Sequence, residues 1–543
     1  MSDDLDRALN LLHTGFPHPY GPIGAGFAAA GVRFAAIGGP LDQRWRQAVA
    51  ELAGCVRVVG DGQPILCEGG VYPGAWIEST ATICTEVLDR FAPEVTAATH
   101  RRFIDGQRED GLIPYKVTDL GPAFSQIQLV TPFARSVWRH YRLAGGDLGY
   151  LRACYDAMAR MDGWLVRYRN TRGTGGVEAF CTFDTGHDLS PRFWHVPDRC
   201  FGGEASRVDP SVPWLPYVAP DLTANVACQR DYLALIAAEL GEDPQPWRTL
   251  ADASRAALWA QCFDEADRCF YDRDASGGFV RVQSDVLLRV LACEIGDGQF
   301  FADALERYLL NTRKFLSHYG FTSLALDDPR FDHDHTRNSW GGPVNFLAML
   351  RAPEAFERHG HVAELAYVTA PVLAALADAD RFPQCLDPWT GAAGFTSGYA
   401  PAILWFLDAV ERTHGILPRP DDSVWLTALP PRPPCRATAY SRTMWETTYE
   451  LLIDAKTATV LRAGEPWLTF PAGWRVELDA DGQVREVVGC SAGTVSGVLR
   501  GCQSDDDPIA ALELGPNEAF RFDGRVFRRV RGVKFVPPRW GDA

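Results

Sequence analysis

A long series of helical stretches constrains the fold of this chain more than any other feature. From about residue 70 to residue 415, apolar residues recur at helical spacing in segments divided by long loops rich in Gly and Pro. Most of these segments are followed by Gly or Asn, as helix ends commonly are. The series predicts about ten to twelve helices, the number that an (α/α)6 toroid needs, with alternate helices lining an inner ring. Clear examples are residues 85–107, 131–146, 148–170, 221–242 and 398–413.

The pattern changes near the C-terminus. A Pro-rich turn region near residues 417–436 ends the helical series, and beyond it apolar and polar residues alternate in short runs, which predicts a β-sandwich-like domain. The first 65 residues contain one helix candidate, residues 41–54, and are otherwise irregular. We therefore predict three parts: an N-terminal segment over 1–65 that packs on the barrel, a mainly α (α/α)6 barrel over 66–416, and a β-rich domain over 417–543.

Composition and charge exclude several classes of function. The 69 acidic residues outnumber the 53 basic ones, and the net charge of −16 disfavours nucleic acid and anionic membrane surfaces as partners. No apolar run is long enough for a transmembrane helix, and the N-terminus lacks the basic and apolar regions of a secretory signal. The 14 cysteines contain no CxxC pair, so we expect reduced thiols, a cytoplasmic location, no zinc cluster and no cofactor. A small-molecule carbohydrate substrate is compatible with this net negative charge. The sequence leaves the oligomeric state open.

Four long irregular segments carry the residues of most chemical interest. Residues 68–80, 183–198, 327–345 and 381–399 combine aromatic side chains with carboxylates and amides. Aromatic rings stack on the faces of sugar rings, and carboxylates and amides bind sugar hydroxyl groups. Loops at one end of a rigid helical scaffold are common places for functional groups. These segments therefore predict a sugar site.

The same segments resemble motifs of trehalases and of the group formed by processing α-glucosidases and mannosylglycerate hydrolases. Residues 185–193, TGHDLSPRF, are similar to the GWDxSxRW motif of these enzymes. Residues 319–344 resemble their YGLPS, DDP and YWRGPVW run, and residues 387–399 resemble their ExYxPxTG and FGWSA segments. Residues 259–272 are similar to the helix exit of the family, which ends in FYD. The motifs follow the family order with the expected spacing.

This resemblance implies hydrolysis of a glycosidic bond with inversion at the anomeric carbon. One carboxylic acid protonates the leaving oxygen while a second carboxylate activates water on the opposite face. Asp188 aligns with the family's general acid, and an apolar, aromatic pocket keeps such a carboxyl protonated near neutral pH. The family's base aligns with Gln384, which cannot accept a proton. Glu78 is the first candidate to replace it, with a role as hydroxyl ligand an equal alternative, and Glu68 and Asp387 are further candidates.

The predicted substrate contacts are side chains that stack on a sugar or bind its hydroxyl groups. They are Tyr72, Trp76, Glu68, Gln128, His187, Arg192, Trp194, His335, Asn338, Trp340, Gln384 and Trp389. Core packing is the structural alternative for the aromatic residues, and helix capping is the alternative for Asp188. Residues 332–335 are of metal-binding types, but successive residues of an extended chain point to opposite sides. We therefore favour a polar loop there and predict no metal.

Three functions are compatible with these features. The first is a glycoside hydrolase that acts on a small soluble glycoside, with an α-linkage and exo action favoured. The second is a sugar epimerase or isomerase on the same toroid, which would use His187, His333 and His335 as acid and base. The third is a carbohydrate-binding protein that has lost its base, as Gln384 permits.

Overall fold

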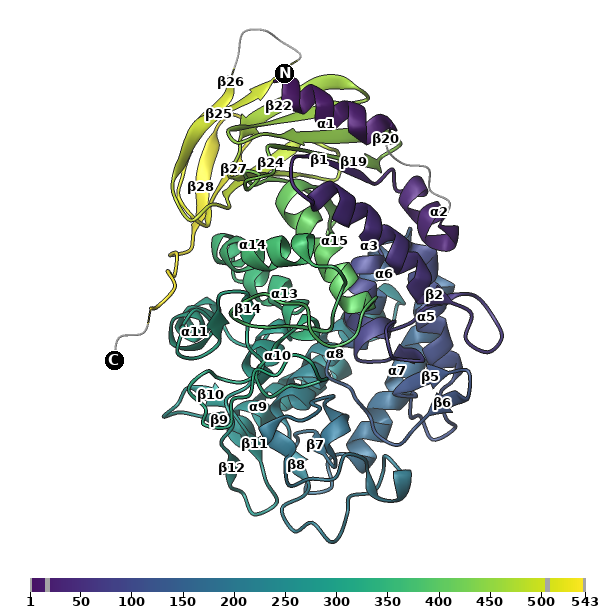
Figure 1. Cartoon of the computed structure of the whole chain (residues 1–543). Helices are drawn as coiled ribbons and strands as arrows, with labels where there is room; N and C mark the ends of the chain where they lie inside the picture. Colours follow the sequence, from purple (N-terminus) through teal and green to yellow (C-terminus); the bar gives the residue numbers. More distant parts are fainter. Residues whose placement is uncertain (1, 15–19, 503–507, 541–543) are drawn as a thin grey trace.

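The computed structural model describes residues 2–14, 20–502 and 508–540, and Figure 1 shows most of its helices gathered below a pair of β-sheets, with the N-terminal helix on the sheets. Within the described part of the chain, twelve α-helices lie between residues 66 and 416, in agreement with the predicted number. The first six are α4 (Thr85–Leu88), α5 (Pro93–Asp105), α6 (Phe133–Leu143), α7 (Leu148–Tyr168), α8 (Pro220–Glu239) and α9 (Gln245–Cys262). The others are α10 (Val286–Ala292), α11 (Gly298–Ala304), α12 (Phe346–Met349), α13 (Ala352–Arg358), α14 (Val362–Asp378) and α15 (Ala400–His414).

Helix α8 illustrates how the sequence separates inner from outer helices. Small and apolar residues lie on all its sides, so that it is buried along most of its length and contacts α6, α7, α9 and α10. Helix α9 buries only one face, through residues such as Ala251 and Leu258. None of the described helices is both long and apolar enough to cross a membrane.

Short strands, which form sheets of two to four strands, lie between the helices. They are β2 (Val56–Arg57), β3 (Ile65–Leu66), β4 (Gly74–Trp76), β5 (Lys116–Thr118), β6 (Gly121–Ala123), β7 (Glu178–Ala179), β8 (Tyr217–Val218), β9 (Phe263–Asp264), β10 (Cys269–Phe270), β11 (Asp272–Arg273), β12 (Phe279–Val280), β13 (Leu316–Ser317), β14 (Gly320–Phe321), β15 (Val344–Asn345) and β16 (Cys385–Leu386). A π-helical turn, Ser79–Ile83, leads into α4, and a second one, Leu305–Leu309, follows α11.

The predicted C-terminal β-rich region is confirmed and consists of two antiparallel sheets. Apolar residues from both sheets, such as Val460 and Val476, belong to one buried cluster, so the sheets form two packed layers. The six-stranded sheet has the order β17 (Ile416–Pro418), β18 (Val424–Ala428), β23 (Trp474–Leu478), β24 (Val484–Gly489), β27 (Glu518–Phe522) and β28 (Phe527–Gly532). The seven-stranded sheet has the order β1 (Arg33–Ile37), β19 (Ala437–Met444), β20 (Thr447–Ile453), β21 (Thr457–Arg462), β22 (Glu465–Pro471), β25 (Val495–Gly501) and β26 (Pro508–Leu514).

The N-terminal segment differs from the prediction that residues 1–65 pack on the barrel. Strand β1 pairs antiparallel with β19, and helix α1 (Asp3–Thr14) packs on the same sheet through Leu5, Ala8 and Leu12. Helices α2 (Gly21–Ala29) and α3 (Leu41–Cys55) do contact the helical region, at α5 and α15. The first part of the segment therefore belongs to the sheets: α1 lies against them in Figure 1, and its apolar residues share a buried cluster with residues of β1 and β19.

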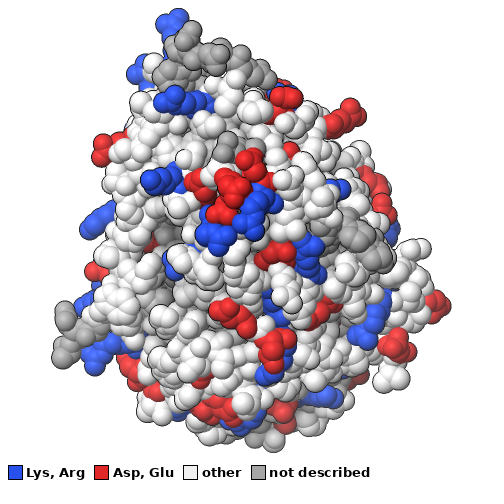
Figure 2. All heavy atoms as spheres, turned by 45° about the horizontal axis from the view of Figure 1, so that its top comes forward, with Lys and Arg blue, Asp and Glu red and all other residues white. Residues whose placement is uncertain are grey.

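Charges of both signs are interspersed on the molecular surface. Figure 2 shows Lys and Arg residues next to Asp and Glu residues over the face that it displays, without a large patch of one sign. A nucleic-acid-binding surface gathers basic residues instead. The face shown therefore has no cluster of basic residues that would bind a polyanion.

Candidate active site

A cavity of about 180 Å³ lies among the loops of the helical region, and its wall combines carboxylates, amides and aromatic rings. Many of the predicted site residues line it, namely Glu68, Tyr72, Trp76, Glu78, Gln128, Asp188, Asn338, Trp340 and Gln384. The wall also contains residues that the sequence did not single out, namely Ser79, Tyr115, Arg199, Leu347 and Tyr399. The loops thus bring residues from five distant segments to one place.

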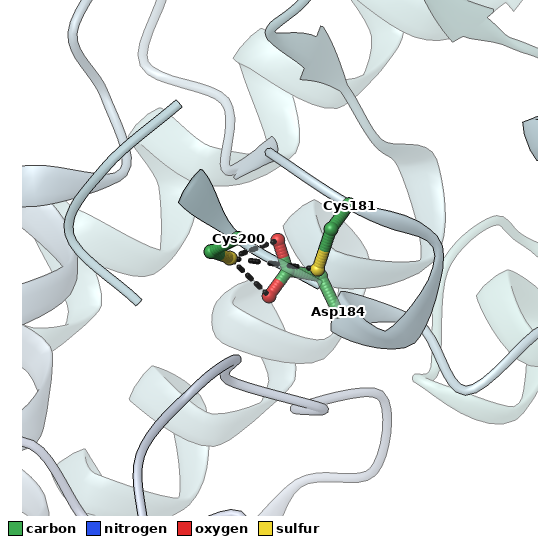
Figure 3. A group of neighbouring side chains, drawn as sticks. All are labelled: Cys181, Asp184 and Cys200. Carbon is green, nitrogen blue, oxygen red and sulfur yellow. Dashed lines mark hydrogen bonds between the residues drawn. The ribbon is translucent and has the colours of Figure 1, made fainter. Parts of the chain in front are cut away.

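A buried cluster closes the neck of the loop that carries Asp188 into this cavity. Figure 3 shows the side chains of Cys181, Asp184 and Cys200 pointing toward one another at the two ends of that loop. The Asp184 carboxylate accepts two hydrogen bonds from the guanidinium of Arg169, at 2.5 and 3.0 Å, and both side chains are fully buried. The neck is therefore held by an ion pair that is removed from water.

The same cluster lies close enough together to share a metal ion, but its donor set does not fit one. Besides the two bonds from Arg169, the Asp184 oxygens accept the backbone N–H groups of Ile127 and Phe180, at 2.9 and 2.7 Å. All four lone pairs of the carboxylate are thereby used. The adjacent guanidinium would also repel a cation. We assign the cluster a structural role.

Asp188 lies at the tip of the loop, where its backbone is held firmly. Its carbonyl oxygen accepts the N–H of Trp340 at 2.9 Å, and the next residue, Leu189, has a left-handed backbone with φ of +60°. Such strain persists where surrounding contacts hold a residue in place. Burial raises the pKa of the Asp188 carboxyl to about 7, the nearby Glu78 adds to the rise, and a hydrogen bond from Asn338 opposes it. The carboxyl can therefore supply a proton near neutral pH.

Glu78 lies against the backbone of the same loop. Gly186, with φ of +69°, approaches so closely that a Cβ atom there would lie 2.1 Å from the Glu78 carboxylate, so glycine is required. The carboxylate accepts a hydrogen bond from Gln128 at 2.9 Å and pairs with Arg351 at 3.3 Å and Arg289 at 3.6 Å. These contacts orient a carboxylate at the cavity wall beside the acid loop.

Glu68 contributes a third carboxyl group to the wall. It is buried and accepts hydrogen bonds from the hydroxyl groups of Ser79 and, at 2.8 Å, Tyr399. Burial raises the pKa of the Glu68 carboxyl to about 7. Each of its oxygens accepts one neighbouring hydroxyl group, which leaves lone pairs of the carboxylate for a sugar hydroxyl.

Two predicted substrate ligands lie behind the cavity wall instead of lining it. The Arg192 guanidinium is fully buried and binds the carboxylates of Asp221 and Asp272, at distances between 2.7 and 3.1 Å. His187 is buried between Arg192 and Asp285, with its ring nitrogens 2.6 and 3.0 Å from them. The prediction that they contact substrate is not supported by these positions. Every hydrogen-bonding group of Arg192 is engaged by protein, so none is left for substrate. Both side chains therefore support the loop that carries Asp188.

Three other predicted ligands are outside the cavity lining. Trp194 is 55% exposed, and its indole N–H donates to the carbonyl oxygen of Leu189 at 3.1 Å. Trp389 is 49% exposed and packs on His333, and the backbone of His335 accepts a hydrogen bond from Phe395. Their indole and imidazole groups therefore belong to the outer loops in this structure.

The second candidate for metal binding, residues 332–335, is a loop whose charges pair with protein groups. Asp332 and Asp334 form ion pairs with Arg337, at 3.0 and 2.7 Å. The imidazoles of His333 and His335 face Asp387, at 3.0 and 3.6 Å. The arrangement agrees with the polar loop favoured by the sequence.

Comparisons with known proteins match the helical region. A family model described as the mannosylglycerate hydrolase MGH1-like glycoside hydrolase domain matches residues 72–401. No curated protein matches the sequence.

Similar solved structures cover the same region. A mannosylglycerate hydrolase from Thermus thermophilus in complex with glucose is 20% identical, with a TM-score of 0.56 over 67% of this chain and 99% of that chain. The neutral trehalase of Saccharomyces cerevisiae is 13% identical, with a TM-score of 0.50 over 64% of this chain and 74% of that chain. A structure described as a sialidase is 12% identical, with a TM-score of 0.59 over 88% of this chain and 44% of that chain. Likenesses at these identities show the fold, a helical toroid.

Proposed function

The chain belongs to the mannosylglycerate hydrolase MGH1-like glycoside hydrolase family, and from this premise we propose that it cleaves a small glycoside with inversion, using Asp188 as the general acid. Family membership makes the chain a glycosidase. The observation that carries the acid role is a carboxyl with a pKa raised to about 7, held in a cavity lined by aromatic rings and amides. The proposal includes an α-linked bond, exo action and an (α/α)6 barrel over residues 66–416 followed by a β-rich domain. The cytoplasmic location stays a prediction from the sequence.

The proposed reaction needs two protein groups. Asp188 gives its proton to the oxygen of the departing group as the glycosidic bond breaks. Glu78 takes a proton from a water molecule that attacks the opposite face of the anomeric carbon, which inverts the configuration of that carbon. Turnover of a panel of α- and β-linked glycosides, with the anomer of the first product followed by NMR, tests this proposal. Release of the retained anomer, or no turnover of any glycoside, would contradict it.

The epimerase alternative has less support from the positions of its histidines. His187 is buried in an ion-pair network, and His333 and His335 lie in an outer loop near Asp387. An epimerase needs an acid and a base that both reach the sugar ring. The carbohydrate-binding alternative would be indicated by affinity for a glycoside that is never cleaved.

Glu78→Ala should separate the roles of base and hydroxyl ligand. If Glu78 is the base, we expect kcat to fall by about 10²-fold, because an unassisted water molecule is a poor nucleophile. Added azide should then restore turnover of an activated aryl glycoside and form a glycosyl azide, since azide attacks without losing a proton. Glu68→Ala is the matched control, with no rescue expected. A Glu78→Ala enzyme that azide leaves unchanged would assign Glu78 to sugar binding.

Two cations on the cavity wall favour a substrate with an anionic group. Lys116 and Arg199 line the cavity, and among the described residues neither lies within ion-pair distance of a carboxylate. The Lys116 ammonium lies 5.5 Å from the centre of the Trp76 ring, over the same wall. Mannosylglycerate, named in the relatives, carries a carboxylate on its non-sugar part. We therefore propose a glycoside of a small organic acid as the substrate class.

Lys116→Met should discriminate between anionic and neutral substrates. We expect KM for a glycosyl glycerate to rise by about tenfold, because a charge-assisted hydrogen bond is lost while the alkyl chain still packs on Trp76. KM for a neutral aryl glycoside of the same sugar should stay within about twofold. Steady-state kinetics with both substrates check this. Equal losses for the two substrates would show that Lys116 supports the fold of the wall.

The wild-type enzyme should lose kcat/KM as the pH rises through about 7. The general acid is active only when protonated, and burial raises the pKa of the Asp188 carboxyl to about 7 from an ordinary value near 4. Measured between pH 5 and 9, kcat/KM should fall about tenfold per unit above this point. A profile that stays level up to pH 9 would remove Asp188 from the role of acid.

A further inference from the structure

The amide of Gln384 is held at both ends by groups of complementary type. The hydroxyl of Tyr72 donates to Gln384 Oε1 at 2.5 Å, and Gln384 Nε2 donates to Asn338 Oδ1 at 2.8 Å. The side chain is buried, with 3% of its surface exposed. In this orientation both polar atoms of the Gln384 amide have a partner within the protein.

This orientation determines which end of Asn338 faces the acid. The oxygen of the Asn338 amide is occupied by Gln384, so its NH2 group is the end left to donate. Asn338 and Asp188 line the same cavity, and a hydrogen bond from Asn338 lowers the pKa of the Asp188 carboxyl. The loops of the two residues are also tied by the backbone bond from Trp340 to Asp188, at 2.9 Å. Hydrogen bonds thus connect Tyr72 and Gln384 to Asn338, which lies beside Asp188.

We propose that Gln384 is a positioning residue, which acts through Asn338 to present an N–H donor to the Asp188 carboxyl. The inference rests on the proposed function. When Asp188 gives its proton to the leaving oxygen, a carboxylate is left in a partly buried place. A donor already aimed at that carboxylate stabilises the charge as it develops, without any rearrangement at that moment.

The proposal explains why an amide, and not a carboxylate, suits position 384 in this chain. A carboxylate there would accept from Tyr72 and could not donate to Asn338. Asn338 would then turn its NH2 group toward residue 384 and its oxygen toward Asp188. The acid would lose its donor and gain a second negative charge nearby, and both changes disfavour its ionised form.

Gln384→Glu tests this series of hydrogen bonds, and two measurements report the pKa of Asp188. We expect the alkaline limb of kcat/KM to move up by at least about one pH unit, since a charge-assisted hydrogen bond is lost. NMR titration of ¹³C-labelled aspartate carboxyls, with the Asp188 signal assigned from Asp188→Asn, should show the same shift without any need for turnover. Asn338→Ala should also raise the pKa of Asp188, because it removes the donor itself.

Gln126→Glu is the matched control, because it adds the same charge to the cavity wall without touching Asn338. A shift in Gln384→Glu and Asn338→Ala that exceeds the shift in Gln126→Glu supports the proposal. Equal shifts in both glutamate variants would overturn it, since charge alone would then account for the change. An unmoved Asp188 in Gln384→Glu, with or without a gain in kcat, would overturn it as well. If no glycoside is cleaved by the wild type, the proposed function fails, while the titration still decides the role of Gln384.

Discussion

Asp188→Asn should lower kcat for an unactivated glycoside by about 10³-fold, because the amide keeps the shape of the acid but has no proton to give. The structure makes this loss specific to leaving-group departure. Asp188 is fixed by the backbone bond from Trp340, and Asn338 can still pair with the oxygen of an amide at this position. We therefore expect KM to change little. Steady-state kinetics on wild type and variant measure both quantities.

The nature of the leaving group supplies the sharpest control for this variant. A dinitrophenyl or fluoride leaving group departs without protonation, so Asp188→Asn should cleave such substrates at close to the wild-type rate. Burial raises the pKa of Asp188, so ionising this carboxyl costs stability as the pH rises from about 4 toward 7. The variant should consequently melt no lower than the wild type at pH 8. A loss of equal size on activated and unactivated substrates would show a damaged site instead of a missing acid.

Asp184→Asn should destabilise the helical region more than any surface change. Asp184 is the partner of the Arg169 guanidinium, and both side chains are fully buried. An asparagine would leave that cation without a counter-charge in a place that water does not reach, which costs about 3–5 kcal/mol. We expect Tm to fall by about 3 °C or more, as measured by differential scanning calorimetry. Activity should fall too, because this pair closes the neck of the Asp188 loop.

Glu204→Gln provides the control for this second variant, because it also neutralises a carboxylate that pairs with an arginine. Its partner is Arg108, at 3.4 Å, but the Glu204 side chain is half exposed. An exposed pair of this kind contributes at most about 1 kcal/mol. Glu204→Gln should change Tm by less than about 1 °C. If Asp184→Asn changed Tm no more than this control, the buried pair would not be what holds the loop.

The sequence predicted the positions of the carboxyl groups better than the roles of their neighbours. Asp188 and Glu78 do line the cavity, because loop motifs and aromatic neighbours mark such places. His187 and Arg192 belong to the same motif but lie behind the wall. A motif does not state which side of an irregular loop a side chain faces, since no fixed period relates residue number to direction there.

Other parts of the site and fold could not be predicted, because they depend on residues far apart in the chain. Tyr399 reaches the cavity by binding Glu68, and no local pattern joins these two segments. Strand β1 is five residues long and apolar, so it is also compatible with a buried stretch of helix. Only pairing with β19 distinguishes the two, and this pairing is a tertiary contact.

The pairing of β1 with β19 determines when the seven-stranded sheet can form during synthesis. Arg33 lies opposite Ser441, so the ribosome makes β1 about 400 residues before the strand with which it pairs. At roughly 5–20 residues per second on the ribosome, this interval lasts roughly 20–80 s. Throughout that time the backbone edge of β1 and the apolar residues of α1 lack the contacts that β19 provides. The seven-stranded sheet can therefore close only after the helical region has been translated, and a nascent chain stalled at the end of α15 should be bound by chaperones at α1 and β1.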